Sequence, residues 1–481
     1  LLLSCMGGVA GLLFTFWSLS LLTSLIPANV PRIEEISVDL RVLGFAFATS
    51  VIAGLLFGLV PSLSLWKNGS GHSLKLEARG SSGSVEGHRL RASLLISQVA
   101  IVMILLSGAA LLTRSFLRLT QVDPGFRPEH LLAFDVSING RSYTNEVLKI
   151  RAVQALLNRS SELPGSESFA AVDGLPLDSG RGNMDIAVND PDGVLSVPPN
   201  EKLVAGLRLV SPGYFDTMRI PLLRGRDFNA SDHVDAAPAV IINETFARKY
   251  FAGGDPIGKR IASPDFGPKP SEIIGISKNV KHASLDATDQ AEVFRPLLQE
   301  CFSSLTIVTR SRAALPQTFE AVKKIVAEVD RNWPIYNART LDHLVSESLA
   351  PRRFALLLMG LFAGLALLLA VIGIYGLFSC VVNERTREIG IRLAVGAQKH
   401  DVIGLILRQG MRPVVLGGVI GLFGACALTR VLRTFLFEVS PTDPLTLLGV
   451  SVLLALVALA ACWLPSRRAT KIDPIIALKY E

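Results

Sequence analysis

The sequence predicts a membrane α-helical bundle with an inserted extracytoplasmic α+β domain. Hydrophobic residues make up 49% of the 481-residue chain and the mean hydropathy is +0.43, values typical of membrane proteins. A transmembrane helix needs about 20 mostly apolar residues, and six stretches meet this requirement: 1–26, 42–66, 92–113, 354–382, 413–435 and 444–464. A long polar region, residues 114–350, separates the third stretch from the fourth.

The positions of the basic residues predict which helix ends face the cytoplasm. The two links 27–39 and 436–443 hold few bases. Three other segments are rich in them: Lys67, Lys75, Arg79, Arg89 and Arg91; Arg385, Arg387, Arg392, Lys399, Arg408 and Arg412; and Arg467, Arg468, Lys471 and Lys479. Because cytoplasmic loops carry the excess of Lys and Arg, these three segments are expected inside and the long polar region outside. The net charge of +7 is therefore interpreted as membrane topology, and no nucleic-acid partner is expected.

A weak internal repeat relates the two ends of the chain. Asp39, Pro61, Leu74, Lys75 and Glu77 match Asp443, Pro465, Leu478, Lys479 and Glu481, each 404 positions later. Chance matching is the alternative explanation. The first apolar run also begins at Leu1 without the basic segment of a signal peptide. We therefore expect residues 1–66 to be the last two membrane helices of a preceding copy, in a chain that starts inside a membrane span.

The polar region mixes strand and helix patterns, which predicts an α+β module with βαβ-type units. Residues 316–329 place apolar side chains at helical spacing after a proline, and residues 145–157 give a second amphipathic helix. Expected strands, rich in β-branched or apolar residues, are Leu131–Ile138, Leu203–Leu209, Ala239–Ile242, Glu272–Ser277 and Leu305–Thr309.

The sequence predicts no catalytic, cofactor-binding or metal-binding residues. Gly253–Arg260 (GGDPIGKR) resembles a phosphate-binding loop, but Arg260 replaces the hydroxyl residue that would hold magnesium and Pro256 removes an amide. A turn is the better interpretation. The seven histidines show no metal-ligand spacing and are expected to be solvated or capping residues. The five cysteines are interpreted as small hydrophobic residues.

The apolar stretches carry no acidic residue at mid-membrane depth. Arg430 and Arg433 lie near one end, where long side chains reach the interface. This absence argues against a proton- or sodium-coupled carrier, which needs an intramembrane polar site. Eight glycines offer faces for close helix packing, within one molecule or at a dimer interface: Gly360, Gly364, Gly373, Gly376, Gly417, Gly418, Gly421 and Gly424.

A charged segment with two glycines, NERTREIGIRLAVGAQKHDV (residues 383–402), links two apolar stretches. Glu384 can pair with Arg387, and Glu388 with Arg392, across helical turns. A second helical run, Asp401 to Arg408, is expected to merge with the next span. The segment could be a hairpin whose charges only anchor topology, or a helix on which a cytoplasmic partner docks.

Residues 387–397 (REIGIRLAVGA) resemble the coupling segment of the FtsX-like ABC permeases, the family of macrolide-exporter (MacB) and lipoprotein-releasing (LolC/LolE) membrane proteins. The tail PSRRATKIDPIIALKYE is similar to the end of that family. The polar region resembles the MacB-like periplasmic core in VDPGF, SPGYFDTMRIPLLRGRDF, INETFARKYFAGGDPIGKRI, EIIGISKNVKH and EVFRPL. The resemblance covers nearly the whole chain.

The resemblance implies a domain order. It comprises 1–66 as the end of a preceding FtsX-like copy, 67–91 as a basic cytoplasmic linker, 92–113 as a membrane helix, 114–350 as the MacB-like periplasmic core, and 354–481 as the FtsX-like domain with spans 354–382, 413–435 and 444–464. The two extra spans are similar to a duplicated subgroup of these permeases. Unlike the macrolide exporter, the chain has no ATPase motif of its own and is not expected to be an enzyme.

The family also implies a bacterial inner-membrane protein that relays ATP hydrolysis to an ectodomain that moves substrate. Its expected partners are a cytoplasmic ABC ATPase, the lipid bilayer, a second permease copy (fused or in a dimer) and a periplasmic adaptor. The residues expected to contact the ATPase are Glu384, Arg385, Arg387, Glu388, Ile389, Gly390, Arg392 and Gly396. Two alternatives remain: a non-transporting scaffold that regulates a periplasmic enzyme, and an orphan permease that needs no ATPase.

Overall fold

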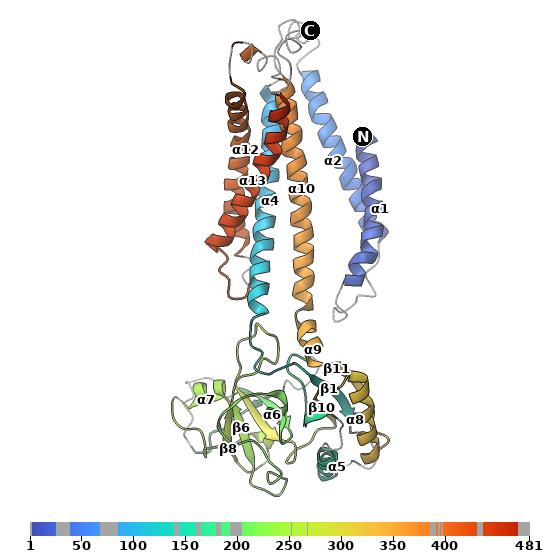
Figure 1. Cartoon of the computed structure of the whole chain (residues 1–481), viewed down its shortest axis with the longest axis vertical. Coiled ribbons are helices and arrows are strands. Elements are labelled where there is room, and N and C mark those ends of the chain that lie inside the picture. The colour runs from blue at the N-terminus through green and yellow to red at the C-terminus, as the bar shows by residue number, and fades with distance from the viewer. Residues whose placement is uncertain are drawn as a thin grey trace. The chain divides into compact units, whose positions relative to one another are not determined.

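The computed structural model divides the chain into two compact units, a helical unit (Leu1–Thr120 with Pro351–Glu481) and a sheet domain (Gln121–Ala350) (Figure 1). The structure describes residues 2–25, 39–67, 85–138, 143, 145–159, 165–178, 184–192, 204–251, 253–266, 268–384, 391–392, 395, 398–430 and 436–469.

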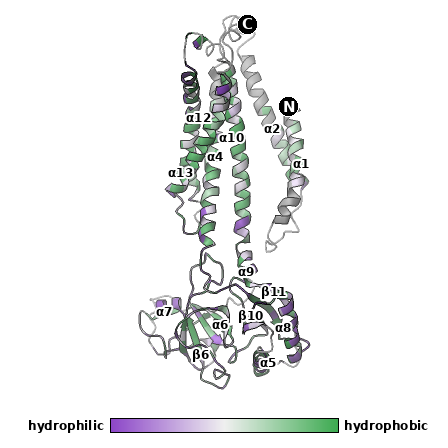
Figure 2. Ribbon diagram, in the orientation of Figure 1, coloured by the Kyte–Doolittle hydropathy of each residue, from purple (hydrophilic) through white to green (hydrophobic). Residues whose placement is uncertain are grey.

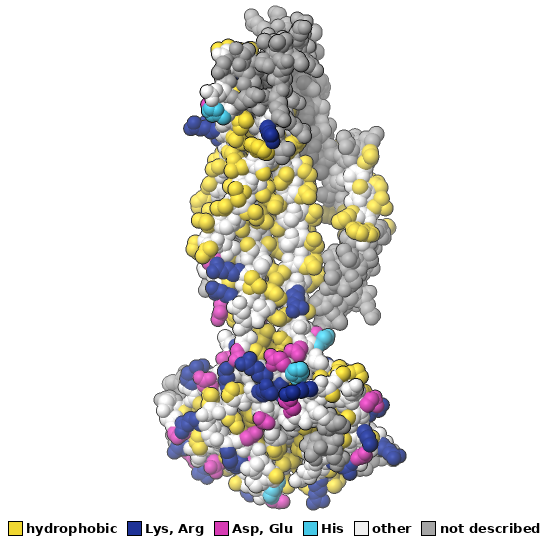
Figure 3. All heavy atoms as spheres, viewed as in Figure 1, with side chains coloured by type: hydrophobic (Ala, Val, Ile, Leu, Met, Phe, Trp, Pro, Cys, Tyr) yellow, Lys and Arg dark blue, Asp and Glu magenta, His cyan; other side chains and the backbone are white. Residues whose placement is uncertain are grey.

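Among the described residues of the helical unit, four long helices are apolar enough to cross a membrane: α4 (Val85–Leu119), α10 (Ala350–Glu384), α12 (Lys399–Leu428) and α13 (Pro444–Ala469). Hydrophobic residues run along all four (Figure 2). Apolar side chains also cover most of the surface of these helices that faces the viewer (Figure 3). An apolar surface of this kind is suited to contact with the lipid tails of a bilayer.

The four helices share one apolar core. It is formed by Leu95, Val99, Val102 and Met103 of α4, Ala370, Ile374, Phe378 and Val382 of α10, Val402 and Val414 of α12, and Val450, Leu454, Ala458, Ala461 and Cys462 of α13. Burial differs among the helices: 44% of the apolar window of α4 is buried, but only 11% of that of α10. Helix α4 is therefore the central helix of the bundle, and α10 packs along one side only.

The expected span 413–435 overlaps a helix that begins before it. Helix α12 begins at Lys399 and ends at Leu428, and its apolar segment starts at His400. Pro413 lies inside the helix. Residues 431–435 fall outside the described part. The expectation that the run 401–408 merges with this span is confirmed.

A helical hairpin precedes the bundle in sequence. It consists of α1 (Leu2–Leu25) and α2 (Leu40–Lys67), which contact each other. Within their described residues, Cys5–Thr15 and Leu40–Ile52 are shorter apolar helical segments. Asp39 directly precedes α2, and Asp443 directly precedes α13, so the pair that the repeat matched occupies the same structural position in both hairpins.

The sheet domain is built on one mixed sheet. The strands along its main path are β11 (Ile335–Thr340), β1 (Leu131–Ser137), β10 (Ser304–Ser311), β2 (Ser166–Val172), β4 (Val204–Val210), β9 (Glu292–Pro296), β6 (Ala239–Asn243), β8 (Ser271–Ser277) and β5 (Leu222–Gly225), in that order. Strand β3 (Met184–Ala187) pairs with β4, and β7 (Arg260–Ile261) with β8. All five expected strands are present, within one or two residues.

The first four strands of the path form two split βαβ units. Strands β1 and β2 both run antiparallel to β10, which lies between them, and α5 (Glu146–Asn158) connects them. Strands β10 and β11 likewise both run antiparallel to β1, which lies between them, and α8 (Leu315–Val329) connects them. Helices α5 and α8 bury Val153, Leu156, Val322 and Val326 in the core that also contains Phe134 and Ile307 of the strands. The predicted α+β fold with βαβ-type units is therefore confirmed.

The remaining strands form a second half of the sheet. Strand β6 leads through α7 (Glu244–Tyr250) to β8, which lies parallel to it, while β4 and β9 form the other parallel pair. The two halves meet where β2 pairs with β4, and the register there consists of the single pair Val172 and Val210. Strands β2, β3, β5, β7, β9 and β11 were not predicted, because their runs are short or include polar residues.

Two glycines of the family-like motifs VDPGF and LLRGRDF occupy positions that no other residue fits. Gly125 has φ +88° and Gly225 has φ +79°. A Cβ at Gly125 would overlap the carbonyl of Asn279, and one at Gly225 would overlap the carbonyl of Ile274. Only glycine combines a positive φ with such a close backbone approach.

Candidate functional site

The expected coupling residues lie around the connection between α10 and α12. Helix α10 ends at Glu384, and Arg392 is in a short helical piece with an exposed side chain. The other expected residues fall outside the described part: Arg385, Arg387, Glu388, Ile389, Gly390 and Gly396. The docking geometry of the segment therefore stays a prediction.

Two apolar residues beside Arg392 were missed in the sequence. Ile391 is 46% exposed and Val395 is 83% exposed. The Val395 amide donates a hydrogen bond to the Ile391 carbonyl at 3.0 Å, so the two side chains lie one helical turn apart. Their four-residue spacing is the signal that could have identified them. Together with Arg392 they present a mixed apolar and cationic surface.

Helix α4 packs against α12 at a glycine face. A Cβ placed at Gly417 would lie 2.7 Å from the Ile96 carbonyl oxygen, and one at Gly421 would lie 2.9 Å from the Ala100 Cα. The two helix backbones can approach this closely only where a side chain is missing. Glycine and other small residues permit such close contact between membrane helices. The predicted intramolecular packing role is therefore confirmed for these two glycines.

A polar clamp fixes the end of α4 to the turn between α12 and α13. The Arg114 guanidinium pairs with the Asp443 carboxylate, and Arg118 donates to the Glu438 carbonyl. The Ser115 hydroxyl accepts a hydrogen bond from the Phe437 amide at 2.8 Å. None of these contacts was predicted, because they join residues more than 300 positions apart.

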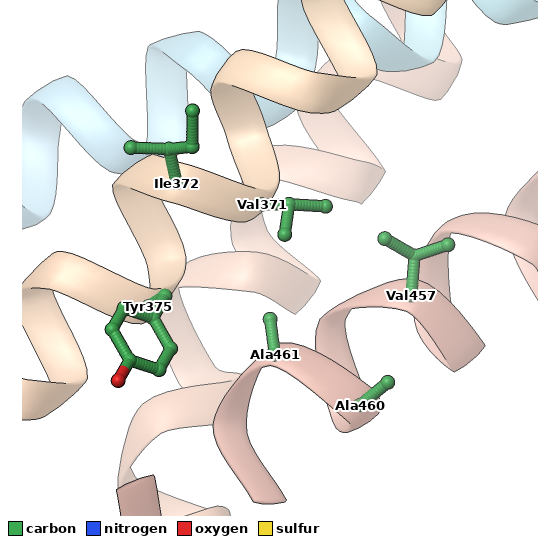
Figure 4. A pocket seen from close by; sticks show the side chains of 6 residues that line it. All are labelled: Val371, Ile372, Tyr375, Val457, Ala460 and Ala461. Carbon is green, nitrogen blue, oxygen red and sulfur yellow. The ribbon is translucent and has the colours of Figure 1, made fainter. Parts of the chain in front are cut away.

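Shallow apolar hollows lie between helices of the described part of the bundle. One hollow of about 350 Å³ lies between α10 and α13 and is lined by Val371, Ile372, Tyr375, Val457, Ala460 and Ala461 (Figure 4). A second, between α4 and α10, includes the polar Gln98. A Cβ at Gly373 would lie 2.5 Å from the Gln98 Oε1. The low burial of α10 and these hollows show that this helix packs loosely against α4 and α13.

The sheet domain buries a charged cluster close to the junction of its two halves. Arg208 of β4 is 3% exposed, and its Nε donates to the His282 Nδ1 at 3.2 Å. His282 Nε2 lies 3.2 Å from the Glu292 Oε1. The expectation that all histidines are solvated or capping is therefore wrong for His282, which is 8% exposed. Its buried position is stabilised by partners that only the fold brings together.

Asp173 belongs to the same cluster. It follows β2 directly and is 7% exposed. Burial raises the pKa of its carboxyl to about 7, although the nearby Arg208 acts in the opposite direction. Among the described residues, none donates a hydrogen bond to the Asp173 Oδ1. The cluster therefore holds a carboxyl whose charged form is poorly accommodated.

The phosphate-loop lookalike is a turn, as expected. Asp255 accepts a hydrogen bond from the Ile257 amide at 3.1 Å and pairs with Arg224 at 2.7 Å. Strand β7 follows at Arg260, whereas a phosphate-binding loop leads into a helix. The five cysteines are free, and burial raises the pKa of Cys301 to about 12, which fits their role as hydrophobic residues.

A bundle of four apolar helices with a large α+β domain inserted after the first of them defines a multi-pass membrane protein with a domain outside the bilayer. Two family models match this architecture: the MacB-like periplasmic core domain over residues 94–325, and the FtsX-like permease C-terminal domain over residues 360–474. The chain therefore belongs to the MacB-type FtsX-like permeases, whose core domain is extracytoplasmic.

Curated relatives are ATP-binding permeases of bacterial exporters. The macrolide export ATP-binding/permease protein MacB of Neisseria meningitidis is 26% identical over 294 residues, which cover 59% of this chain and 44% of the relative. The pyoverdine export ATP-binding/permease protein PvdT of Pseudomonas syringae is 24% identical over 270 residues, covering 54% and 40%. The chain thus spans less than half the length of these relatives.

Two of the solved structures similar to this chain are ectodomains. The periplasmic region of MacB from Actinobacillus actinomycetemcomitans matches with a TM-score of 0.30 and 16% identity, over 46% of this chain and 94% of that one. The extracellular domain of the transporter YknZ from Gram-positive bacteria matches with a TM-score of 0.28 and 15% identity, over 43% of this chain and 100% of that one.

Proposed function

We propose that the chain is the permease component of an ABC-type export or mechanotransmission system of the bacterial inner membrane. In this proposal a separate cytoplasmic ATPase hydrolyses ATP, and the helical bundle relays its movement to the ectodomain, which moves the substrate. Family membership supports this role, because the related exporters combine ATP-binding and permease parts.

Helix α10 is the observation that carries the proposal. It runs without interruption from Ala350, the last residue of the sheet domain, to Glu384, where the coupling segment begins. At 1.5 Å per residue, a 35-residue helix is about 52 Å long. Only 11% of its apolar window is buried. A long, continuous and loosely packed helix can move as one lever without breaking a large interface.

The ATPase contact is proposed at the coupling segment. Arg392 provides a cation, and Ile391 and Val395 provide exposed apolar surface one turn apart. Apolar side chains exposed to water beside charges are typical of protein interfaces. The charged residues Glu384, Arg385, Arg387 and Glu388 and the glycines Gly390 and Gly396 would complete the docking helix. A second permease copy and a periplasmic adaptor are further proposed partners.

Reversing the charges of the coupling segment tests this function. In Glu388→Arg with Arg392→Glu, the full-length protein should no longer co-purify with cytoplasmic ABC ATPases from its own cells, and it should no longer stimulate their ATP hydrolysis in liposomes. Ile391→Ser with Val395→Ser should have the same effect, because it removes the apolar part of the contact.

The matched control is Arg312→Glu. The Arg312 side chain is 82% exposed in the sheet domain. Its substitution also reverses a charge, but at a position distant in sequence from the coupling segment. Normal ATPase binding by the coupling variants would refute the docking role. Failure of the unmodified protein to stimulate any ATPase would instead favour an orphan permease.

A further inference from the structure

The hairpin of α1 and α2 repeats the hairpin of α12 and α13 in sequence. Residues 7–12 read GGVAGL and residues 417–422 read GGVIGL. In each hairpin an aspartate then caps the second helix: the Arg41 amide donates to the Asp39 Oδ1 at 3.0 Å, and the Thr446 amide donates to the Asp443 Oδ2 at 2.9 Å. The capping geometry is that of a helix N-terminus.

The two hairpins also share their internal register. A Cβ at Gly8 would lie 3.3 Å from the Phe47 ring of α2. The equivalent Gly418 lines a hollow together with Ser451 of α13. Phe47 and Ser451 each lie eight residues after the capping aspartate of their hairpin. The two hairpins thus bring equivalent positions toward each other, although no described atom lies within 4 Å of a Cβ placed at Gly418.

One face of the two hairpins differs in burial. Gly417 and Gly421 are buried, because the backbone of α4 lies against them. Their equivalents Gly7 and Gly11 are exposed, and no described atom lies within 4 Å of a Cβ placed at either position. The neighbouring lipid-facing positions are exposed in both hairpins. The same glycine face is thus occupied in one hairpin and open in the other.

The capping aspartates show the same difference. Asp443 pairs with Arg114 of α4. Within the described part of the chain, Asp39 pairs with no cation, and its side chain is exposed. A helix that packed on α1 as α4 packs on α12 would bring its own basic residue to this carboxylate. The occupant is therefore specified by charge complementarity as well as by shape.

We propose that Gly7, Gly11 and Asp39 form the docking surface for a transmembrane helix of the α4 type, supplied by another permease module of this family. The occupant is not α4 of this chain or of a second copy, because α4 already uses its packing face on Gly417 and Gly421. The inference goes beyond the proposed function, since it concerns assembly of a second bundle and needs no ATPase.

The two repeated hairpins differ at one position of the glycine face, and this difference defines the occupant further. Phe14 occupies the position of Gly424, against which Ile104 of α4 packs. Phe14 is 59% exposed. The helix that docks on α1 must therefore carry a small residue where α4 has Ile104, with a Lys or Arg near its outer end.

Disulfide crosslinking in membranes tests the surface. The probe is a tagged peptide of residues 85–119 with Ile104→Cys, expressed beside the full chain whose five native cysteines are replaced. Phe14→Cys in the full chain should form a disulfide with the probe. The intramolecular pair Gly424→Cys with Ile104→Cys is the positive control, because only side-chain atoms meet there. Leu13→Cys, on the lipid-facing side with 66% exposure, is the negative control.

Two further variants separate the contributions of shape and charge. Adding Gly11→Ile should abolish the Phe14→Cys crosslink, because the side chain fills the face. Asp39→Arg should weaken it several-fold, and Arg114→Asp in the probe should restore it. The proposal is overturned if crosslinking at Phe14→Cys does not exceed that at Leu13→Cys while the positive control forms. A disulfide between Phe14→Cys and Leu365→Cys of α10 in the same chain would also overturn it.

Discussion

The guanidinium of Arg114 on α4 is paired with the carboxylate of Asp443, which also caps the first turn of α13. The pairing joins the central helix of the bundle to the hairpin formed by α12 and α13. The pKa of Asp443 lies below its usual range, first because Thr446 hydrogen-bonds to the carboxylate and further because Arg114 is close. One carboxylate therefore performs two structural tasks.

This double role predicts an ordered series of stabilities. Asp443→Ala should lower the melting temperature of the detergent-solubilised protein more than Arg114→Ala, because it removes the helix cap as well as the ion pair. The double variant should melt no lower than Asp443→Ala alone, since the ion pair is already lost. Additive losses would show that Arg114 acts through some other contact. Circular dichroism at 222 nm would measure the series.

The contact between α4 and α12 predicts strong sensitivity to a single methyl group. Gly421→Ala should destabilise the bundle by about 1–3 kcal/mol, because its Cβ would lie 2.8 Å from the Ala100 carbonyl oxygen and 2.9 Å from its Cα. Gly418→Ala is the matched control on the same helix, where no described atom lies within 4 Å of the added Cβ. Equal effects of the two substitutions in a denaturant titration would contradict the close packing.

The fold class was predictable because it depends on local patterns. Long apolar runs determine membrane helices, and the spacing of Val322, Ile325 and Val326 is enough to identify α8. Buried β-branched runs such as Ala239–Asn243 likewise identify strands. Helix bounds were less predictable: Pro413 lies inside α12 although proline usually ends a helix.

The long-range contacts were not predictable in the same way. Arg114 and Asp443, or Arg208 and His282, are separated in sequence and meet only in the fold. Residue type gives no signal for such pairs, because an arginine on a strand is more often solvated than buried. The candidate coupling segment was visible as a charged, glycine-containing stretch, but its exposed apolar residues Ile391 and Val395 required the structure.

Because Arg208 is buried, its removal should strongly lower the stability of the sheet domain. Arg208→Met should cost about 3–5 kcal/mol of sheet-domain stability, because Asp173 would be left buried without its nearby cation and His282 without its hydrogen-bond donor. The matched control Arg312→Met should cost less than about 1 kcal/mol, since the Arg312 side chain is 82% exposed. Urea unfolding of the full-length protein in detergent measures both.

Trp333 can report this unfolding selectively. It is the tryptophan of the sheet domain and is 5% exposed, so its fluorescence would follow that domain once Trp17, Trp66 and Trp463 are replaced by phenylalanine. A small effect of Arg208→Met, similar to that of Arg312→Met, would show that the cluster tolerates uncompensated carboxylates, for example by protonation.

Protonation of Asp173 predicts how the stability of the sheet domain depends on pH. Its pKa is about 7 in the folded protein, against a usual value of 3.8, so the folded state binds more protons between these pH values. The contribution of Asp173 to the stability of the sheet domain should therefore be highest below about pH 4 and fall as the pH rises to about 7. The loss contributed by Asp173 should be on the order of 2–4 kcal/mol.

Asp173→Asn should remove this loss, because the amide stays neutral at every pH. Asp192→Asn is the contrasting control: the Arg260 side chain lowers the pKa of Asp192, so that pair stabilises the fold at higher pH and loses its effect on acidification. The control should leave the fall between pH 4 and 7 in place. Urea midpoints of the three proteins at several pH values test the prediction, and an unchanged fall in Asp173→Asn would assign the titration to another group.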